Sequence, residues 1–269
     1  MLSKAALAAY EPITTSLSDL GAFVATDGNG STSSDHPQTR TTTNRLLSAL
    51  PASDYERLLP LLHTISLRGR QILYRPGDTI RRVYFPTGST CSITSVMNDG
   101  RMLEVATIGN EGMVGITAFL GGDRPPCGAV VQVPGGDVQS MSLEAFREEI
   151  DRHGPFYDVV SRYSQAFLAL VLQLSACNGL HKVEQRCCRW LLTTHDRVGT
   201  DEFHVTQEFL ALMFGVHRPT LTFIARALQK AGLIDYHRGK LRITNRKGLE
   251  AASCECYAMV RAHFDRLLL

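Results

Sequence analysis

One stretch, from Val205 to Leu228, limits the possible folds of this chain more than any other. Apolar residues recur at helical spacing on both sides of Gly215, and Thr206 is a residue type that caps the start of a helix. Gly215 supplies the backbone freedom that a tight turn between two helices needs. The stretch therefore predicts two short helices joined by that turn.

The second of these helices is predicted to begin near Arg218 and to have two unlike faces. Leu221, Ile224 and Leu228 form an apolar inner face. Pro219 fits only the first turn, where a backbone N–H has no partner within the helix. The outer face carries Arg218, Thr220, Thr222, Phe223 and Arg226. Such a basic and polar face is typical of helices that enter the major groove of DNA.

A β-hairpin with a basic tip follows this helix pair. Residues 233–236 and 241–243 are predicted strands, and Arg238, Gly239 and Lys240 form the turn between them. Residues 205–247 contain 8 Lys or Arg and 2 Asp or Glu. The combination predicts a winged helix, in which the hairpin tip meets phosphates while the second helix contacts bases. The alternative is a helical hairpin on the protein surface whose basic face contacts solvent and not DNA.

The rest of the chain has the composition of a folded protein with two electrically unlike parts. Its 269 residues are 44% hydrophobic, enough for one large domain or two modest ones. Residues 181–269 hold 14 Lys or Arg against 9 Asp or Glu, whereas residues 1–180 hold 14 against 17. A basic C-terminal part that follows an acidic N-terminal part is expected of a sensor domain joined to a nucleic-acid-binding domain.

Short β-type runs separated by turn signals fill the region from Ile65 to Leu143. The runs are Gln71–Tyr74, Arg82–Phe85, Cys91–Val96, Met102–Ile108, Ala129–Val133 and Val138–Ser140. Asn98-Asp99-Gly100, between two alternating runs, predicts a hairpin. We therefore expect an antiparallel β-roll, which with a short helical stretch before it occupies residues 44–152.

A long helix is predicted after Pro155, over residues 153–181. One stripe on it has the spacing of a coiled-coil seam: Phe156, Val160, Tyr163, Phe167, Leu170, Leu174 and Cys177. Val159, Leu168, Val171 and Leu172 form a second apolar face. A helix with two apolar faces usually has two neighbours, so we predict that the stripe is a homodimer interface. The alternative is a helix buried in a single core.

The two ends of the chain and its cysteines complete the organisation. Residues 1–43, rich in Ser, Thr and Gly, are predicted to be a flexible tail, and residues 182–269 form the winged-helix domain with a terminal helix over 245–269. Seven irregularly spaced cysteines argue against a secreted disulfide framework. No apolar run has the length of a membrane span, and a reducing cytoplasm is the expected location.

These segments together resemble the Crp/Fnr family of transcription regulators. The match has no gaps from Val205 through Leu228, and Pro76-Gly77-Asp78, Val83-Tyr84-Phe85 and Gly112–Gly115 resemble the family's β-roll. The resemblance covers about residues 44–247. It implies an α+β fold with a cyclic-nucleotide-binding-like antiparallel β-roll, a dimerisation helix and a C-terminal winged helix-turn-helix. It also implies double-stranded DNA, a second copy of the chain and RNA polymerase as partners.

The resemblance assigns roles to residues around the second helix. Arg218, Pro219 and Phe223 lie in the positions that hold Arg, Glu and Arg in the family's cAMP-dependent member, so only the first base-reading residue is kept. Thr206, His217 and Thr220 fall on positions that face phosphates. The full predicted DNA-binding set is Thr206, His217, Arg218, Pro219, Thr220, Thr222, Phe223, Arg226, Arg238 and Lys240.

The resemblance also indicates a degenerate effector pocket at Gly115, Ile116, Pro126 and Cys127. The family's cyclic-nucleotide binders have Glu after this glycine and an Arg followed by Ser or Thr ten residues on, where this chain has Ile116, Pro126 and Cys127. Neither Ile nor Pro can pair with a phosphodiester or a ribose hydroxyl. We therefore expect a regulator that does not depend on cAMP, although a loop shift that recruits Arg124 is an alternative.

No cofactor or metal site is predicted. No Cys precedes Cys91, which excludes the N-terminal iron–sulfur cluster of Fnr-type members, and Cys254 and Cys256 are too close in sequence to form a tetrahedral site alone. A thiol switch at these cysteines or at Cys187 and Cys188 is an alternative role for them.

The chain lacks the catalytic motifs of hydrolases and nucleotide-binding enzymes, so we predict no enzyme activity. The alternative function is a β-roll that senses a ligand or redox state while the C-terminal part binds protein.

Overall fold

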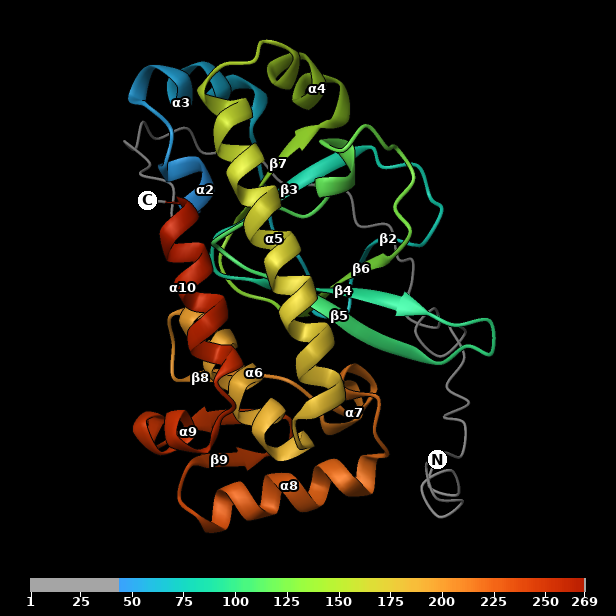
Figure 1. Cartoon of the computed structure of the whole chain (residues 1–269), viewed down its shortest axis with the longest axis vertical. Helices are drawn as coiled ribbons and strands as arrows, with labels where there is room; N and C mark the ends of the chain where they lie inside the picture. The colour runs from blue at the N-terminus through green and yellow to red at the C-terminus, as the bar shows by residue number, and fades with distance from the viewer. Residues whose placement is uncertain (1–43, 269) are drawn as a thin grey trace, which may run out of the picture.

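The computed structural model describes residues 44–268 and consists of a β-roll and a helical domain connected by one long helix (Figure 1). The long helix α5 (Pro155–Leu180) runs the length of the roll and ends at the C-terminal domain. Helix α10 (Cys256–Leu268) returns along α5 towards the N-terminal helices. The predicted tail, residues 1–43, lies outside the described residues.

Short N-terminal elements are tied to the roll by one buried polar side chain. They are α2 (Arg45–Ser48), α3 (Ala52–Leu58) and the 3-10 helix η1 (Leu59–Leu61). The Asn44 carboxamide oxygen accepts a hydrogen bond from the Leu47 N–H at 3.1 Å and so caps α2. Its nitrogen donates to the carbonyls of Pro86 and Gly112 at 2.8 and 2.9 Å. Asn44 thereby fixes where the chain enters the roll.

The predicted antiparallel roll is confirmed. Its strands are β1 (His63–Ile65), β2 (Ile72–Tyr74), β3 (Arg82–Pro86), β4 (Thr90–Val96), β5 (Met102–Ile108), β6 (Gly128–Val133) and β7 (Val138–Ser142). They form a three-stranded sheet in the order β1-β7-β3 and a four-stranded sheet in the order β2-β6-β4-β5. The 3-10 helix η2 (Ile116–Ala118) lies between β5 and β6, and α4 (Leu143–Asp151) follows β7. The sequence did not predict β1, which has only three residues.

Helix α5 completes the core of the roll. Phe156 and Tyr163 on α5 are fully buried, and the Tyr163 hydroxyl donates to the Met113 carbonyl at 2.9 Å. Gly112 lies so close that an added Cβ would sit 2.3 Å from Tyr163 Cε2. The contact requires glycine at this position, because no other side chain fits under the tyrosine ring.

The stripe predicted as a dimer interface faces the chain's own core instead. Phe156, Val160, Tyr163, Leu170, Leu174 and Cys177 are at most 3% exposed, and Phe167 is half-buried. All but Cys177 pack in the core that the roll and α10 share, and Cys177 is buried in a small cluster with Cys254 and Cys256. These residues are therefore interior residues of one chain and not the predicted interface. The opposite face of α5 is the exposed apolar one, with Leu168 at 59% and Leu172 at 63% exposure.

The C-terminal domain has the predicted winged-helix order. Its elements are α6 (Val183–Val198), β8 (Glu202–His204), α7 (Gln207–Phe214), α8 (Arg218–Lys230), β9 (Ile234–His237), β10 (Lys240–Ile243) and α9 (Arg246–Ala252). The sequence did not predict β8, which pairs with β10 to give a sheet in the order β8-β10-β9. None of the helices among the described residues is long and apolar enough to cross a membrane.

The single terminal helix predicted over residues 245–269 is in fact two helices, α9 and α10. The chain breaks at residues 253–255 and α10 then packs along α5. Val260 and Phe264 of α10 are buried in the core of the roll, with the Phe264 ring centroid 6.4 Å from that of Tyr163. The last helix therefore serves the sensor core, although the sequence placed it in the DNA-binding domain.

Candidate nucleic-acid interface

The turn between α7 and α8 is defined at both ends by local hydrogen bonds. Thr206 Oγ1 accepts from the Phe209 N–H at 3.2 Å and caps α7. Gly215, with φ +64°, ends α7 in the left-handed conformation, and the Val216 N–H then bonds to the Ala211 carbonyl at 3.0 Å. These bonds direct α8 away from α7 at a defined angle, as the glycine turn predicted.

Helix α8 divides into a buried and an exposed face. Leu221, Ile224 and Leu228 are buried in the core of the C-terminal domain. His217, the residue before α8, and Arg218, Pro219, Thr220, Phe223 and Arg226 on the helix are all exposed. Phe223 is 70% exposed, which is unusual for a large aromatic side chain. The exposed set contains most of the predicted DNA-binding residues.

Arg218, the predicted base-reading residue, is held by a weak partner. Its Nε lies 2.9 Å from Glu208 Oε1 on α7, and both side chains are more than half exposed. An exposed ion pair of this kind contributes about 0–1 kcal/mol. Arg218 can therefore exchange this carboxylate for an acceptor on a base edge at little cost.

Two residues of the predicted DNA-binding set have partners within the protein. The Thr222 hydroxyl lies 2.7 Å from Gln207 Oε1 and 3.0 Å from the Arg218 carbonyl, so it braces α8 against α7. Thr206 accepts a 2.7 Å hydrogen bond from Arg70 Nη2, in the roll, in addition to capping α7. In this structure both hydroxyls hold the helix pair in place.

The wing is a tight hairpin with cations at its tip. Arg238 and Gly239 have φ +50° and +82°, as expected for a two-residue turn of the type found in hairpins. Lys240 Nζ lies 2.6 Å from Glu202 Oε1, and Arg242 Nη2 lies 2.8 Å from Glu202 Oε2. These partners, Lys240 first, lower the pKa of Glu202. Sequence reasoning missed Glu202 because its strand is recognisable only from its pairing with β10.

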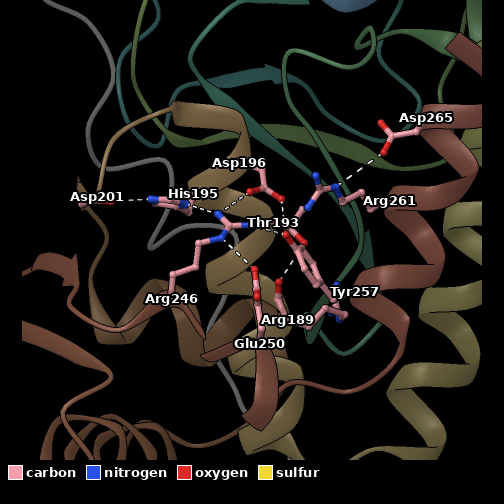
Figure 2. Close-up of polar contacts among 10 residues, drawn as sticks. All are labelled: Arg189, Thr193, His195, Asp196, Asp201, Arg246, Glu250, Tyr257, Arg261 and Asp265. Atoms are coloured by element: carbon pink, nitrogen blue, oxygen red, sulfur yellow. Dashed lines mark hydrogen bonds and ion pairs between the residues drawn. The ribbon is translucent and has the colours of Figure 1, made fainter. Parts of the chain in front are cut away.

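A polar network holds α9 and α10 against α6 (Figure 2). The Arg246 guanidinium contacts Asp196 Oδ1 at 2.7 Å, Glu250 Oε1 at 3.0 Å and the Tyr257 hydroxyl at 2.6 Å. The same hydroxyl donates to Asp196 Oδ2 at 2.7 Å. Arg246 begins α9 and Tyr257 lies in α10, so the network connects both terminal helices to the first helix of the domain.

The DNA-binding domain is docked on the outer face of the four-stranded sheet. Val130 and Val133 of β6 are buried with the core residues of that domain. Arg197 of α6 forms a buried ion pair with Glu111, with Nη2 and Oε1 2.6 Å apart, and donates to the Thr107 carbonyl at 2.8 Å. Sensor and DNA-binding domain thus share both an apolar and an ionic contact.

The predicted effector pocket residues offer no charged side chain. Gly115 is buried with φ +108°, Ile116 packs into the core of the roll, Pro126 is exposed and Cys127 is half-buried. Tyr74, which the sequence did not single out, is buried and interacts with the backbone of Gly115. Burial, followed by the nearby thiols of Cys91 and Cys127, raises the pKa of the Tyr74 hydroxyl. A neutral phenol therefore lies beside the glycine of the pocket.

Arg124 is directed to a neighbouring loop. Its Nη1 donates to the Gly77 carbonyl at 3.2 Å, and the side chain is exposed. The geometry does not place this guanidinium at the positions of Pro126 and Cys127.

An exposed basic helix, a wing and a docked β-roll define a DNA-binding transcription regulator with a sensor domain. Residues 64–153 match the family model described as cyclic nucleotide-binding domain, and residues 185–252 match the Crp-like helix-turn-helix domain. Together the two models span more than half of the chain, which belongs to the Crp/Fnr family of transcriptional regulators. The family is one of regulators and not of enzymes.

Solved structures show the same fold at low sequence identity. A proposed Crp/Fnr regulator from Eubacterium rectale is 18% identical with a TM-score of 0.58, covering 77% of this chain and 96% of its own. FixK2 from Bradyrhizobium japonicum is 13% identical with a TM-score of 0.61, covering 72% and 98%. The c-di-GMP-responsive regulator CLP from Xanthomonas campestris is 19% identical with a TM-score of 0.54, covering 72% and 99%. Among curated proteins none matches this chain.

Proposed function

We propose that this regulator binds an inverted repeat in duplex DNA as a homodimer, with α8 reading bases, and that it does so without cAMP. The observation that carries the proposal is the exposed outer face of α8, with Arg218, Thr220, Phe223 and Arg226. A helix that follows a tight turn and presents such a face fits the major groove.

Base and phosphate contacts are expected from different residues. Arg218, near the start of α8, is suited to a bidentate contact with guanine. Arg238 and Lys240 on the wing are suited to phosphates, because a hairpin tip beside the groove meets the backbone of the duplex. Phe223 stands where another member has a base-reading Arg, so the preferred sequence is expected to differ from that member's.

The outward face of α5 is the proposed dimer contact. Leu168 and Leu172 are exposed one helical turn apart, and Val171 between them is half-buried. Pairing two such helices would cover these leucines and place two copies of α8 about one turn of DNA apart. This replaces the inward stripe that the sequence analysis favoured.

Independence from cAMP follows from the chemistry of the pocket. A buried cyclic phosphate must exchange its water for charged donors, and leaving an anion unpaired costs several kcal/mol. Ile116, Pro126 and Cys127 provide no charge, and Pro126 also lacks a backbone donor. An effector of this roll is expected to be less anionic.

Selection of bound fragments from genomic DNA, followed by binding titrations, tests the proposal. Arg218→Ala is expected to weaken the selected sequence by about 1–3 kcal/mol and to leave binding to random DNA nearly unchanged, whereas Lys240→Ala weakens both alike. Arg147→Ala, which removes an exposed cation on α4, is the matched control and should change neither. Equal losses on selected and random DNA for both variants would contradict the base-reading role of Arg218.

The competing function is a ligand or redox sensor whose C-terminal domain binds protein. DNA retention that falls steeply with salt separates the two, because phosphate contacts release counterions and a protein contact does not. RNA polymerase as a partner and the cytoplasm as the location stay predictions.

A further inference from the structure

Three cysteines and one histidine from distant parts of the chain meet where α5 ends. Cys177 lies in the last turn of α5 and His181 directly follows that helix, while Cys254 lies in the break between α9 and α10 and Cys256 is the first residue of α10. The three sulfur atoms and one imidazole nitrogen all lie within 4.8 Å of one another. Cys177 Sγ is 3.6 Å from Cys254 Sγ, and Cys256 Sγ is 3.6 Å from His181 Nδ1.

We propose that these four side chains bind one zinc ion. Zinc in protein sites takes four ligands at the corners of a tetrahedron, with Zn–S bonds of about 2.3 Å, so neighbouring sulfurs lie about 3.8 Å apart. The 3.6 Å between Cys177 Sγ and Cys254 Sγ is close to this edge. The 3.6 Å between Cys256 Sγ and His181 Nδ1 fits a sulfur–nitrogen edge, which is shorter because a Zn–N bond is about 2.0–2.1 Å. Cys254 and Cys256 alone cannot complete a site, so the sequence predicts no metal; the fold supplies the other two ligands.

The surrounding side chains orient the ligands as they do in metal sites. His181 Nδ1 faces the sulfurs while its Nε2 lies 3.2 Å from Glu255 Oε2. A metal-binding histidine commonly donates its second ring N–H to a carboxylate in this way, which fixes the ring and its tautomer. Gln173 Nε2 donates to Cys256 Sγ at 3.1 Å, as expected for a side chain that supports a thiolate.

Charge and burial also favour a bound cation. The three cysteines are buried in a small cluster of their own, apart from the two main cores. Three thiolates, a neutral imidazole and Zn²⁺ have a net charge of −1, and the buried Arg189 lies close enough to offset it.

The geometry argues against two other uses of the cysteines. In a [4Fe–4S] cluster each thiolate binds a different iron, and in a [2Fe–2S] cluster the four ligands are divided between two irons, so in both the four ligands spread farther apart than they do here. A disulfide between Cys177 and Cys254 would engage two of the four groups and leave Cys256 and His181 without a role. Four protein ligands close the coordination shell, so the ion would be structural. It would join the α5–α6 connection to the start of α10.

The test is the metal content of the full chain, purified without an affinity tag under reducing conditions. One zinc per chain is expected by mass spectrometry of the metal. Replacement by Co²⁺ should give the visible absorption of a tetrahedral thiolate site. An iron–sulfur spectrum, or wild-type chain that stays free of zinc after incubation with Zn²⁺, would overturn the proposal. So would a Cys177–Cys254 disulfide in protein alkylated at lysis.

Variants test the ligand assignment. Cys177→Ser and Cys256→Ser should each lose zinc, whereas His181→Cys should retain it because four thiolates also bind zinc. Cys188→Ala, at a buried cysteine outside the cluster, is the matched control and should keep full zinc content. Loss of zinc from this control equal to that from Cys177→Ser would refute the assignment. If the serine variants do not fold, the zinc content of the wild-type chain and of His181→Cys decides the question.

Discussion

Glu104 in β5 is a carboxyl group whose burial should make the stability of the protein depend on pH. Its side chain is buried, and Ser92 Oγ and Gln132 Nε2 both donate to Oε2 at 2.6 Å. Burial raises the pKa of Glu104 to about 7, against the lowering effect of Ser92, Arg189 and Gln132. The folded state therefore binds this proton more tightly than the unfolded state, whose pKa is 4.5.

The magnitude follows from that difference in pKa. About 2.5 units at about 1.4 kcal/mol each give a cost of about 3 kcal/mol at pH 8, where the unfolded carboxyl is ionised. As the pH falls from 7 towards 4.5, the folded state takes up the proton first and the free energy of unfolding rises. At pH 5 the remaining cost is about 1 kcal/mol or less.

Glu104→Gln replaces the carboxyl with a neutral group of the same shape. Its carbonyl oxygen has two lone pairs and can accept from both Ser92 and Gln132. The variant is expected to be more stable than the wild type by up to about 3 kcal/mol at pH 8 and by about 1 kcal/mol or less at pH 5.

Urea unfolding followed by fluorescence at both pH values measures this. Glu148→Gln, at an exposed carboxylate on α4, is the control and should show no such difference. A Glu104→Gln variant that is less stable at pH 8, or whose advantage is the same at both pH values, would refute the reasoning.

Two further predictions concern the dimer and the effector. Leu172→Glu on α5 is expected to give monomers by light scattering and to lose binding to the inverted repeat. Leu120→Glu, at an exposed leucine of the roll, is the control and should leave both the dimer and DNA binding unchanged. A dimeric Leu172→Glu variant would contradict the proposed contact. Titration calorimetry should detect no binding of cAMP or cGMP; a micromolar signal that Arg124→Ala abolishes would mean that this arginine has taken over the phosphate-binding role.

Local chemistry made most of the fold predictable from the sequence. The glycine turn at Gly215, the hairpin at Asn98–Gly100 and the helix start at Pro155 each follow from the conformational preference of one or two residues, and the structure confirms all three. The outer face of α8 followed from helical spacing in the same way. These features depend on neighbours within a few residues, and a single sequence contains that information.

Features that depend on long-range contacts could not be predicted in this way. Helix α5 has apolar residues on both faces, so the spacing of those residues does not show which face packs on the roll. The packing of α10, nearly a hundred residues later, helps to determine which face is buried. Cys177 and Cys254 are 77 residues apart in the chain, and nothing local indicates that they touch. Strands β1 and β8 have three residues each, too few for an alternating pattern.

The docking of the two domains explains why Glu104 is buried at all. Its face of the four-stranded sheet is covered by α6 and α7, which also bury Val130 and Val133. Moving the DNA-binding domain off the sheet would expose Glu104 to water. Because an ionised carboxyl is more stable in water, this exposure favours separation of the domain from the sheet once Glu104 is ionised. It would also expose the two valines and separate Arg197 from Glu111, and breaking a buried ion pair by removing one partner costs about 3–5 kcal/mol. The position of the DNA-binding domain, and with it that of α8, therefore depends on opposing free energies. The apolar contact and the ion pair favour docking, and they outweigh the cost of burying the Glu104 carboxyl.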